Sequence, residues 1–244
     1  MKPLIHAPRL VDQVYEAILS AITDRRFDDD RRLIQEDIAT ELGVSRQPVQ
    51  QALLLLRSQG LLREAPGRGL MLAPFDVVHM RHLYEIRATL DGLATRKAAQ
   101  SSSDLIKQGP EWIEKGRAAI KGGSVAQMIA ADLDFHLFLY KVSGNPLIAE
   151  SSVTHWSYLR RVMAEVLMRG ETPREIWDQH EAILDAVIAR DPDTAERLAT
   201  MHISHAADTL AARMADDDKD KDKDKDKDKD KDKDKPAAEG ESPT

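Results

Sequence analysis

The chain has 244 residues and no cysteine, which excludes disulfides, thiolate metal sites and cysteine nucleophiles. Hydrophobic residues make up 42% of the sequence and charged residues 32%, values typical of a soluble globular protein, and no apolar run is long enough to span a membrane. The formal net charge is −7, but residues 1–74 carry as many basic as acidic side chains, which leaves room for a local basic face. The N-terminal stretch has no apolar signal core, so we expect a cytoplasmic protein.

The first part of the chain predicts three helices. Residues 9–25 carry apolar side chains at helical spacing, as do residues 35–42, where Gly43 is expected to end the helix. A third helix is predicted from Ser45 to residue 60, with the Ser45 hydroxyl capping its first turn. Two short helices joined by "GVS" have the spacing of a helix-turn-helix.

A short hairpin is predicted directly after these helices. Two apolar runs, at residues 61–62 and 70–72, flank the turn "APGRG". The hairpin could be an ordinary surface hairpin. The hairpin follows a helix-turn-helix directly and carries Arg68 at its tip. These two features favour its interpretation as the wing of a winged helix-turn-helix.

The third predicted helix carries side chains suited to reading DNA. The first residues of a recognition helix enter the major groove, where Arg46 could fork to guanine or hold a phosphate, and Gln47 and Gln50 could address adenine. Arginines nearby could neutralise phosphates, and the wing could reach the minor groove. The alternative is that all of these are solvated surface residues. The candidate DNA-binding residues are Arg32, Ser45, Arg46, Gln47, Gln50, Arg57 and Arg68.

From residue 75 onward the pattern is helical up to residue 214. Six helices separated by turns that contain glycine or proline predict an antiparallel all-α bundle. They are expected at 76–99, 103–121, 124–143, 146–169, 173–190 and 192–214. The fold is therefore expected to be mainly α, with a winged domain over residues 1–74 and a bundle over 75–215. Residues 216–244 consist largely of alternating Asp and Lys and are expected to be disordered, with a charged solvent-exposed helix as the alternative.

Four residues of the bundle could form a metal site. Asp132 and His136 lie four residues apart in "DLDFHLFLYKVSGNP", so they project from one face of a helix. His180 and His202 belong to two later helices, and a bundle can bring the three faces together. Three imidazoles and a carboxylate suit zinc first, with nickel, manganese or iron as alternatives. The competing interpretation is that these are hydrogen-bonded core residues.

The first domain resembles the DNA-binding domain of GntR-family transcription regulators. The stretch "RLIQEDIATELGVSRQPVQQALLLLRSQGLLREAPGRGLML" contains the family's helix-turn-helix core and its Gly-Arg-Gly wing. The resemblance covers essentially residues 9–74 and implies binding to double-stranded DNA. Family members usually carry an arginine that contacts DNA where this chain has Gln50, so the operator sequence is expected to differ from the usual one. The turn at "RRFDDDRR" also departs from the family pattern.

Residues 75–214 resemble the FCD effector domain of the FadR-type subgroup. The matching stretches are "YEIRATLDGLATRKAA", "DLDFHLFLYKVSGNP" and "QHEAILDAVIARDPDTAERLATMHISHA". The resemblance implies that Asp132, His136, His180 and His202 bind a metal. It also implies that Arg87 reaches the effector cavity, where a guanidinium suits a carboxylate. The alternative role of Arg87 is a surface ion pair with Asp91, four residues on.

These features together predict a regulator that responds to a metabolite. We expect a transcription regulator without enzyme activity, a repressor, which binds a palindromic operator as a homodimer and is controlled by a small organic acid held at the metal and Arg87. A metal-dependent hydrolase is the rival, because an open three-histidine site could activate water. A bundle whose metal is purely structural is the third interpretation.

Overall fold

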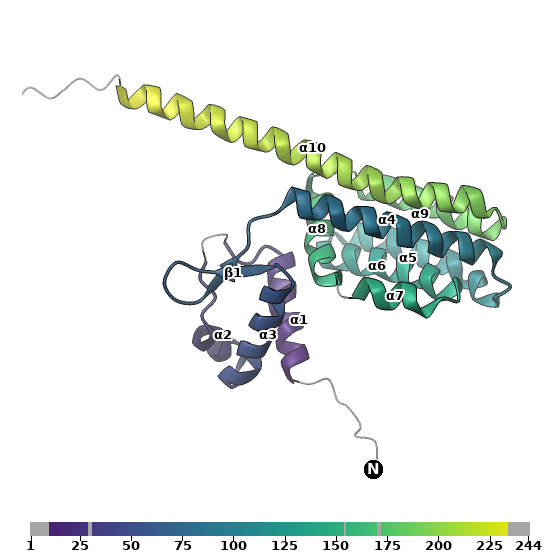
Figure 1. Ribbon diagram of the computed structural model, residues 1–244, viewed down its shortest axis with the longest axis horizontal. Coiled ribbons are helices and arrows are strands. Elements are labelled where there is room, and N and C mark those ends of the chain that lie inside the picture. Colours follow the sequence, from purple (N-terminus) through teal and green to yellow (C-terminus); the bar gives the residue numbers. More distant parts are fainter. Residues whose placement is uncertain (1–9, 29–30, 154, 170–171, 234–244) are drawn as a thin grey trace, which may run out of the picture.

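The computed structural model describes residues 10–28, 31–153, 155–169 and 172–233. It is mainly α-helical, with a winged helix-turn-helix at one end of a helical bundle, as Figure 1 shows. The predicted fold class is confirmed. In the turn "RRFDDDRR", residues 29–30 lie outside the described part of the chain.

The winged domain is built on three helices, α1 (Leu10–Thr23), α2 (Gln35–Leu42) and α3 (Arg46–Ser58). Gly43 ends α2 with a φ of 65°, a left-handed conformation that favours glycine. Val49, Ala52 and Leu56 are fully buried on one face of α3, so its opposite face is exposed. Ser45 stands at the N-cap of α3, but its side chain makes no capping hydrogen bond, so the predicted capping role of its hydroxyl is wrong.

The wing is an antiparallel pair of strands, β1 (Leu62–Glu64) and β2 (Leu70–Leu72). Leu33, just before α2, adds a bridge to Leu70, with its N–H donating to the Leu70 carbonyl at 2.7 Å. This bridge ties the wing to the segment that leads into the helix-turn-helix. Gly69 has a φ of 94°, and a β-carbon there would lie 3.2 Å from the Leu33 carbonyl oxygen, so the turn of the wing depends on glycine.

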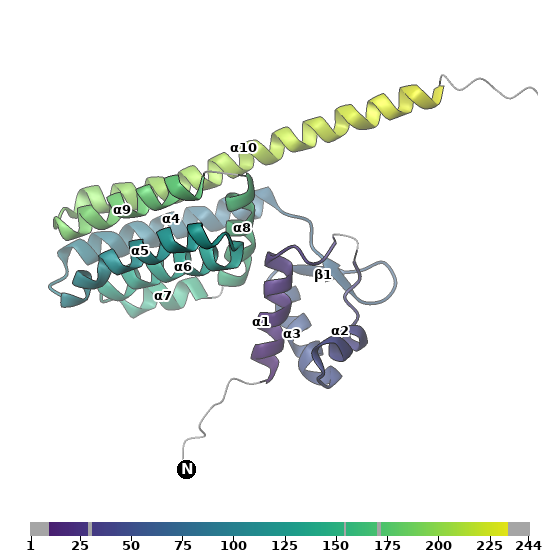
Figure 2. The same cartoon turned by 180° about the vertical axis from the view of Figure 1, so that it is seen from behind.

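The rest of the chain forms the bundle, in which α4 and α10 lie side by side (Figures 1 and 2). Two predicted helices are each divided. The segment predicted as 103–121 begins with a short 3-10 helix before α5, whose first turn holds Pro110. The segment predicted as 146–169 is two helices, α7 and α8. The elements are α4 (Val77–Gln100), η1 (Asp104–Gln108), α5 (Gly109–Gly122), α6 (Val125–Val142), α7 (Pro146–Val153), α8 (Trp156–Arg169), α9 (Pro173–Ile188) and α10 (Pro192–Lys233).

The last helix corrects one expectation. Disorder was expected from residue 216, but the backbone of α10 is helical to Lys233 and runs beyond the bundle (Figure 1). This corresponds to the alternative of a charged helix. A helix that is already packed against α4 can be extended without a new nucleation step, and no proline or glycine interrupts the Asp-Lys stretch. Residues 234–244 lie outside the described part.

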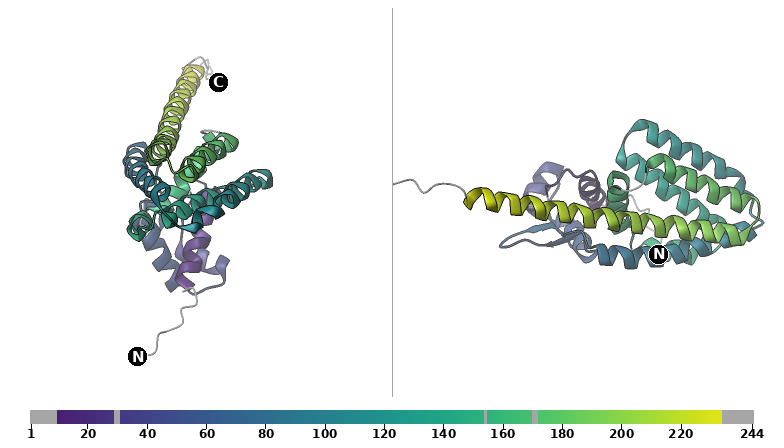
Figure 3. Two further views of the ribbon diagram at one scale, coloured as in Figure 1. Left: turned by 90° about the vertical axis from the view of Figure 1, so that its right-hand side faces the viewer. Right: turned by 90° about the horizontal axis from the view of Figure 1, so that it is seen from above.

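The winged domain and the bundle share a core. Helix α1 packs against α8 (Figure 2), and Ile18 and Leu19 belong to the same cluster of buried side chains as Tyr158 and Val162 of α8. Ion pairs flank this contact, one of them between Arg160 of α8 and a glutamate of α1 at 2.7 Å. Seen from above in Figure 3, the winged domain lies at one end of the bundle. None of the helices in the described residues is both apolar and long enough to cross a membrane.

Candidate functional site

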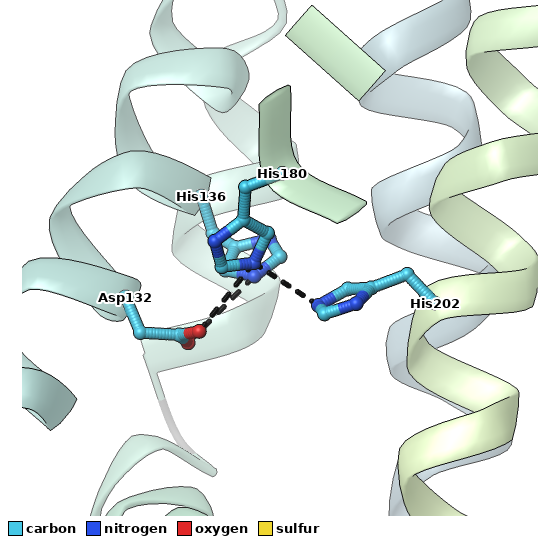
Figure 4. Close-up of side chains that lie close together, drawn as sticks. All are labelled: Asp132, His136, His180 and His202. Atoms are coloured by element: carbon cyan, nitrogen blue, oxygen red, sulfur yellow. Dashed lines mark hydrogen bonds and ion pairs between the residues drawn. The ribbon is translucent and has the colours of Figure 1, made fainter. Parts of the chain in front are cut away.

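The bundle brings one aspartate and three histidines together in its interior. Asp132 and His136 come from α6, His180 from α9 and His202 from α10, and their side chains converge in Figure 4. One candidate ligand atom from each residue lies within 4.8 Å of the others. The histidines are between 0% and 8% exposed, so the cluster is shielded from bulk water. These four residues form a group that could hold a metal ion, which agrees with the site predicted from the sequence.

The distances inside this cluster fit a small cation. The Nε2 atoms of His180 and His202 are 3.1 Å apart, and His180 Nε2 lies 3.5 Å from Asp132 Oδ1. A tetrahedral zinc ion bound at its usual distance places two imidazole nitrogens about 3.3 Å apart. The donor set therefore requires only small adjustments to hold zinc.

The orientation of His136 supports the same interpretation. Its Nδ1 lies 2.7 Å from Asp91 Oδ1, and Tyr140 donates to the other oxygen of Asp91 at 3.0 Å. Burial opposes ionisation of Asp91, but His136 and Arg87 outweigh it and lower the pKa of this carboxyl. Asp91 is thus a carboxylate, so His136 donates to it from Nδ1 and turns its Nε2 towards the cluster. That Nε2 atom is buried and has no hydrogen-bond partner among the described residues, as expected of a metal ligand.

The other two histidines are held in the form that binds metals. His202 Nδ1 lies 2.6 Å from Oε1 of Gln179, an amide oxygen that accepts its hydrogen and leaves Nε2 to face the cluster. Burial, together with the neighbouring imidazoles and Arg87, keeps the pKa values of His180 and His202 well below the ordinary value. Both rings are therefore neutral near pH 7, and neutral imidazole is the ligand form.

Arg87 lies beside the cluster and not on the surface. Its Nε is 3.4 Å from Asp91 Oδ2, and its Nη2 is 3.7 Å from Asp132 Oδ2. The ion pair with Asp91 that the sequence suggested as an alternative is present, but Arg87 is only 8% exposed, so the pair is buried. Burial opposes the charge, yet Asp91, Tyr84 and Asp132 raise the pKa of Arg87 above its ordinary value. A permanent cation thus adjoins a candidate metal ligand.

A small cavity opens next to these groups. It has a volume of about 40 Å³, and Arg87, Asp132 and His202 contribute to its wall. Five helices of the bundle line it, among them α8, which also touches the winged domain. The cavity therefore lies between the cluster and α8, the helix that packs against α1 of the winged domain.

The predicted DNA-binding residues lie on the exposed side of the winged domain. Glu36 Oε1 accepts from Arg68 of the wing at 2.8 Å and from Arg46 of α3 at 3.3 Å. Its own backbone N–H, followed by Arg68 and Arg46, lowers the pKa of Glu36, so this carboxylate stays charged. A single side chain thus links the start of α3 to the wing.

Two of the remaining candidates line a groove between α3 and the wing. The groove has a volume of about 330 Å³, and Gln50 and Arg57 line it. Arg57 pairs with Glu64 of β1 at 3.0 Å. Arg32 lies beside the wing, since a β-carbon on Gly67 would lie 3.8 Å from its Nη1. The other two candidates, Ser45 and Gln47, are exposed at the start of α3.

Sequence reasoning missed three supporting residues. Asp91 was considered only as an ion-pair partner of Arg87, and Gln179 and Glu36 were not considered. Each of the three contacts a residue of another element: Asp91 contacts His136, Gln179 contacts His202, and Glu36 contacts Arg68. Such contacts form only when the chain folds. The one signal present in the sequence was the spacing of Asp91 four residues after Arg87, which puts both on the mostly apolar inward face of α4.

A winged helix-turn-helix joined to a helical bundle that contains a buried imidazole cluster defines a DNA-binding protein with a separate sensory domain. Comparison with known families agrees. Residues 10–72 match the model described as "Bacterial regulatory proteins, gntR family", and residues 82–205 match the FCD domain. The chain belongs to the GntR family of DNA-binding transcription regulators and carries an FCD domain. The family consists of transcription regulators, not enzymes.

Individual relatives are distant but cover most of the chain. The HTH-type transcriptional repressor RspR of Escherichia coli K12 is 23% identical over 199 residues, which are 81% of this chain and 87% of RspR. The probable D-xylose utilization operon transcriptional repressor of Paenarthrobacter nicotinovorans is 25% identical over 198 residues, 80% of this chain and 86% of that protein. Among solved structures, E. coli McbR/YncC superimposes with a TM-score of 0.71 at 23% identity, over 85% of this chain and 100% of McbR/YncC. This last likeness concerns the fold.

Proposed function

We propose that this regulator is a repressor whose affinity for its operator is controlled by a small organic acid bound at a metal site in the bundle. One observation carries the proposal: the convergence of Asp132, His136, His180 and His202 beside a buried arginine and a cavity. A divalent zinc ion suits the donor set, with nickel, manganese or iron as alternatives. When bound, such an ion supplies a Lewis acid that attracts an anionic oxygen.

In this proposal the protein side chains hold the acid in a defined orientation. Arg87 is the cation that binds the carboxylate, because its planar guanidinium can form two parallel hydrogen bonds to it. Asp91 holds Arg87 and His136 at the same time, so the arginine and the metal ligand keep a fixed relation. The buried surroundings strengthen both contacts, since little water screens them.

The DNA contacts are assigned to the winged domain. We assign Arg46, Gln47 and Gln50, with Ser45, to the major groove, and Arg32, Arg57 and Arg68 to phosphates or to the minor groove. Glu36 supports this assignment, because it keeps the arginines of α3 and the wing near each other before DNA arrives. A regulator that binds chromosomal operators acts in the compartment that holds the chromosome, which favours the cytoplasm.

A homodimer on a palindromic operator fits the surface of the bundle. Val78, Ile86 and Leu93 of α4 are 62%, 52% and 41% exposed and are spaced about two helical turns apart, so they lie along one face. An apolar stripe of this kind is costly to leave in water and suits a second copy of the helix. Two-fold symmetry of the protein would match the two halves of a palindrome.

Helix α8 provides a route from the cavity to the winged domain. Met163, Val166 and Leu167 line the cavity, whereas Arg160 pairs with α1 and Arg161 donates to the Ala73 carbonyl of the linker at 2.8 Å. A ligand that shifts α8 would therefore shift the winged domain. An effector that prefers one arrangement by about 3 kcal/mol would change operator affinity up to roughly 150-fold.

The proposal is tested with three measurements on full-length protein. DNA fragments retained from its own genome identify the operator, and elemental analysis of protein purified without an affinity tag gives the metal content. A screen of carboxylic acids then measures release from the operator for wild type and Arg87→Ala. We expect acids to release the wild type and to lose this effect in the variant. A metal-loaded protein whose operator binding responds to no acid would instead favour a purely structural metal.

A further inference from the structure

We propose that the effector is a carboxylic acid with an apolar body, aromatic or branched aliphatic, and not a sugar acid or another polyhydroxylated acid. This inference rests on the proposed function and specifies its ligand. It is drawn from the wall of the cavity beside Arg87, where polar and apolar side chains are sharply separated.

The polar groups of the cavity form a single patch. Arg87 Nη2 lies 3.7 Å from Asp132 Oδ2. The Cζ atom of Arg87 lies over the ring of Tyr84, 5.6 Å from the ring centroid. His202 belongs to the metal cluster with Asp132. Burial raises the pKa of Tyr84 to about 12, so its hydroxyl stays protonated and able to donate. One anionic head group can therefore be bound at this patch.

The remainder of the wall offers almost nothing to a hydroxyl group. Apart from Pro173, Trp177 and Ala206, it consists of aliphatic and thioether side chains from four helices. These are Met128, Met163, Val166, Leu167, Ile176 and Ile203. Arg87 is the one guanidinium or ammonium group that the described residues place in this wall, which also disfavours a second carboxylate.

Such a wall discriminates strongly between two acids with the same head group. A hydroxyl buried against it without a partner lowers affinity by roughly 5- to 150-fold, whereas each methylene that it covers raises affinity about 4-fold. The cavity is small, about 40 Å³, so the body must be compact. Met128 and Met163 have unbranched side chains that can change rotamer and admit it.

The test compares matched acids on full-length, zinc-loaded protein by calorimetry. The probes are phenylacetate and 4-methylpentanoate, which are apolar, gluconate, which is polyhydroxylated, and phenylacetamide, which is neutral. We expect both apolar acids to bind at least about 10-fold more tightly than gluconate, with a negative heat-capacity change. Gluconate binding as tightly as phenylacetate would overturn the inference and leave the proposed function standing. Phenylacetamide binding as well as phenylacetate, or binding by none of the acids, would overturn the proposed function itself.

A pair of variants on α8 locates the effect in the cavity wall. Val166→Thr introduces a hydroxyl into the wall without changing the shape of the side chain, and Val162→Thr makes the same change at a buried position of the same helix outside the wall. We expect Val166→Thr to weaken phenylacetate binding about 5-fold or more and Val162→Thr to leave it within about 2-fold of wild type. Equal losses in the two variants would show that the wall does not contact the acid body and would overturn the inference.

Discussion

At the scale of single residues, Asp91 contacts both the candidate metal ligand His136 and Arg87. It accepts from His136 and Tyr140 and pairs with Arg87, so one carboxylate orients both a candidate metal ligand and the proposed acid-binding group. Its contact with His136 joins α4 to α6 across 45 residues of sequence. Spacing along one helix cannot reveal such a partner, which is why it had to come from the structure.

Asp91→Asn should weaken zinc binding by about 10- to 100-fold while all four candidate ligands remain. The amide keeps the shape of the side chain but removes the charge that holds His136 and Arg87. Competition with a chelator of known affinity measures the change. Asp134→Asn is the matched control, because Asp134 lies on the exposed side of α6. An unchanged zinc affinity in Asp91→Asn would show that the orientation of His136 is fixed by packing alone.

Arg46→Ala should cost about 1–3 kcal/mol of operator binding if Arg46 contacts a base. The loss should be greatest on the specific operator, since a base contact carries sequence information. Titrations at two salt concentrations separate the alternatives, because loss of a phosphate contact lowers the salt dependence by about one unit of slope. Arg117→Ala in the bundle changes the net charge equally and should have no effect. Full affinity in Arg46→Ala combined with Arg68→Ala would remove the winged domain from the DNA interface.

The four candidate ligands could be predicted because chemistry and spacing coincide in the sequence. Asp132 and His136 lie at i and i+4, and His180 and His202 are polar residues on two otherwise apolar helix faces. The orientation of each ring depends on Asp91 and Gln179, and those contacts exist only after the helices have packed. Arg87 could be chosen as a candidate from the sequence. Its burial could not be predicted, because it too depends on how the helices pack.

At the scale of elements, the start of α9 is stabilised by a capping box. Thr172 accepts from the backbone N–H of Glu175, and Glu175 accepts from the backbone N–H of Thr172 at 3.0 Å. Pro173 occupies the first turn, where its missing N–H does no harm. Because α9 carries His180 and part of the cavity wall, this cap fixes the first turn of a helix that belongs to the candidate site.

Thr172→Ala should lower the free energy of unfolding by about 1 kcal/mol near pH 7. The backbone and hydroxyl of Thr172 lower the pKa of Glu175, so the contribution of this carboxylate is present at neutral pH. It is lost as the pH falls below about 4.3 towards the lower pKa of the folded state. Urea unfolding near neutral pH and at about pH 3, well below the ordinary carboxyl pKa, measures both effects. Thr172→Ser should behave as wild type, and a loss independent of pH would exclude the part played by Glu175.

The positions of helices were more predictable than their divisions. Apolar periodicity gave every long helix of the bundle, because burial of one face dominates its stability. The break between α7 and α8 follows "SSV", a stretch without glycine or proline in which the Ser152 hydroxyl donates to the Ile148 carbonyl at 3.0 Å and so competes for a backbone acceptor. The continuation of α10 to Lys233 depends on the packing of its first half against the bundle. The composition of the Asp-Lys stretch alone does not predict that packing.

At the scale of the whole molecule, the exposed stripe on α4 predicts the assembly. Ile86→Glu places a charge in the middle of this stripe and should raise the dissociation constant of the dimer by roughly 30-fold, equivalent to about 2 kcal/mol. Operator affinity should fall with it, because in the proposed dimer each monomer contacts one half-site. Light scattering over a concentration series measures the assembly. Ile188→Glu on α9 is the control, since Ile188 has a similar exposure of 48% and lies off the stripe. Equal behaviour of the two variants would place the interface elsewhere.

The shared core of α1 and α8 has a consequence for building hybrid regulators. A sensor assembled by joining this bundle to a foreign winged domain near residue 75 would set an unmatched first helix against Tyr158 and Val162. On the proposed mechanism, such a hybrid would fold in both halves and still fail to respond to the effector, because the proposed connection passes through this contact and not only through residues 73–76. Transplanting the buried face of α1 together with the wing, or redesigning α8 to fit the new helix, is therefore the step on which a working biosensor from this scaffold would depend.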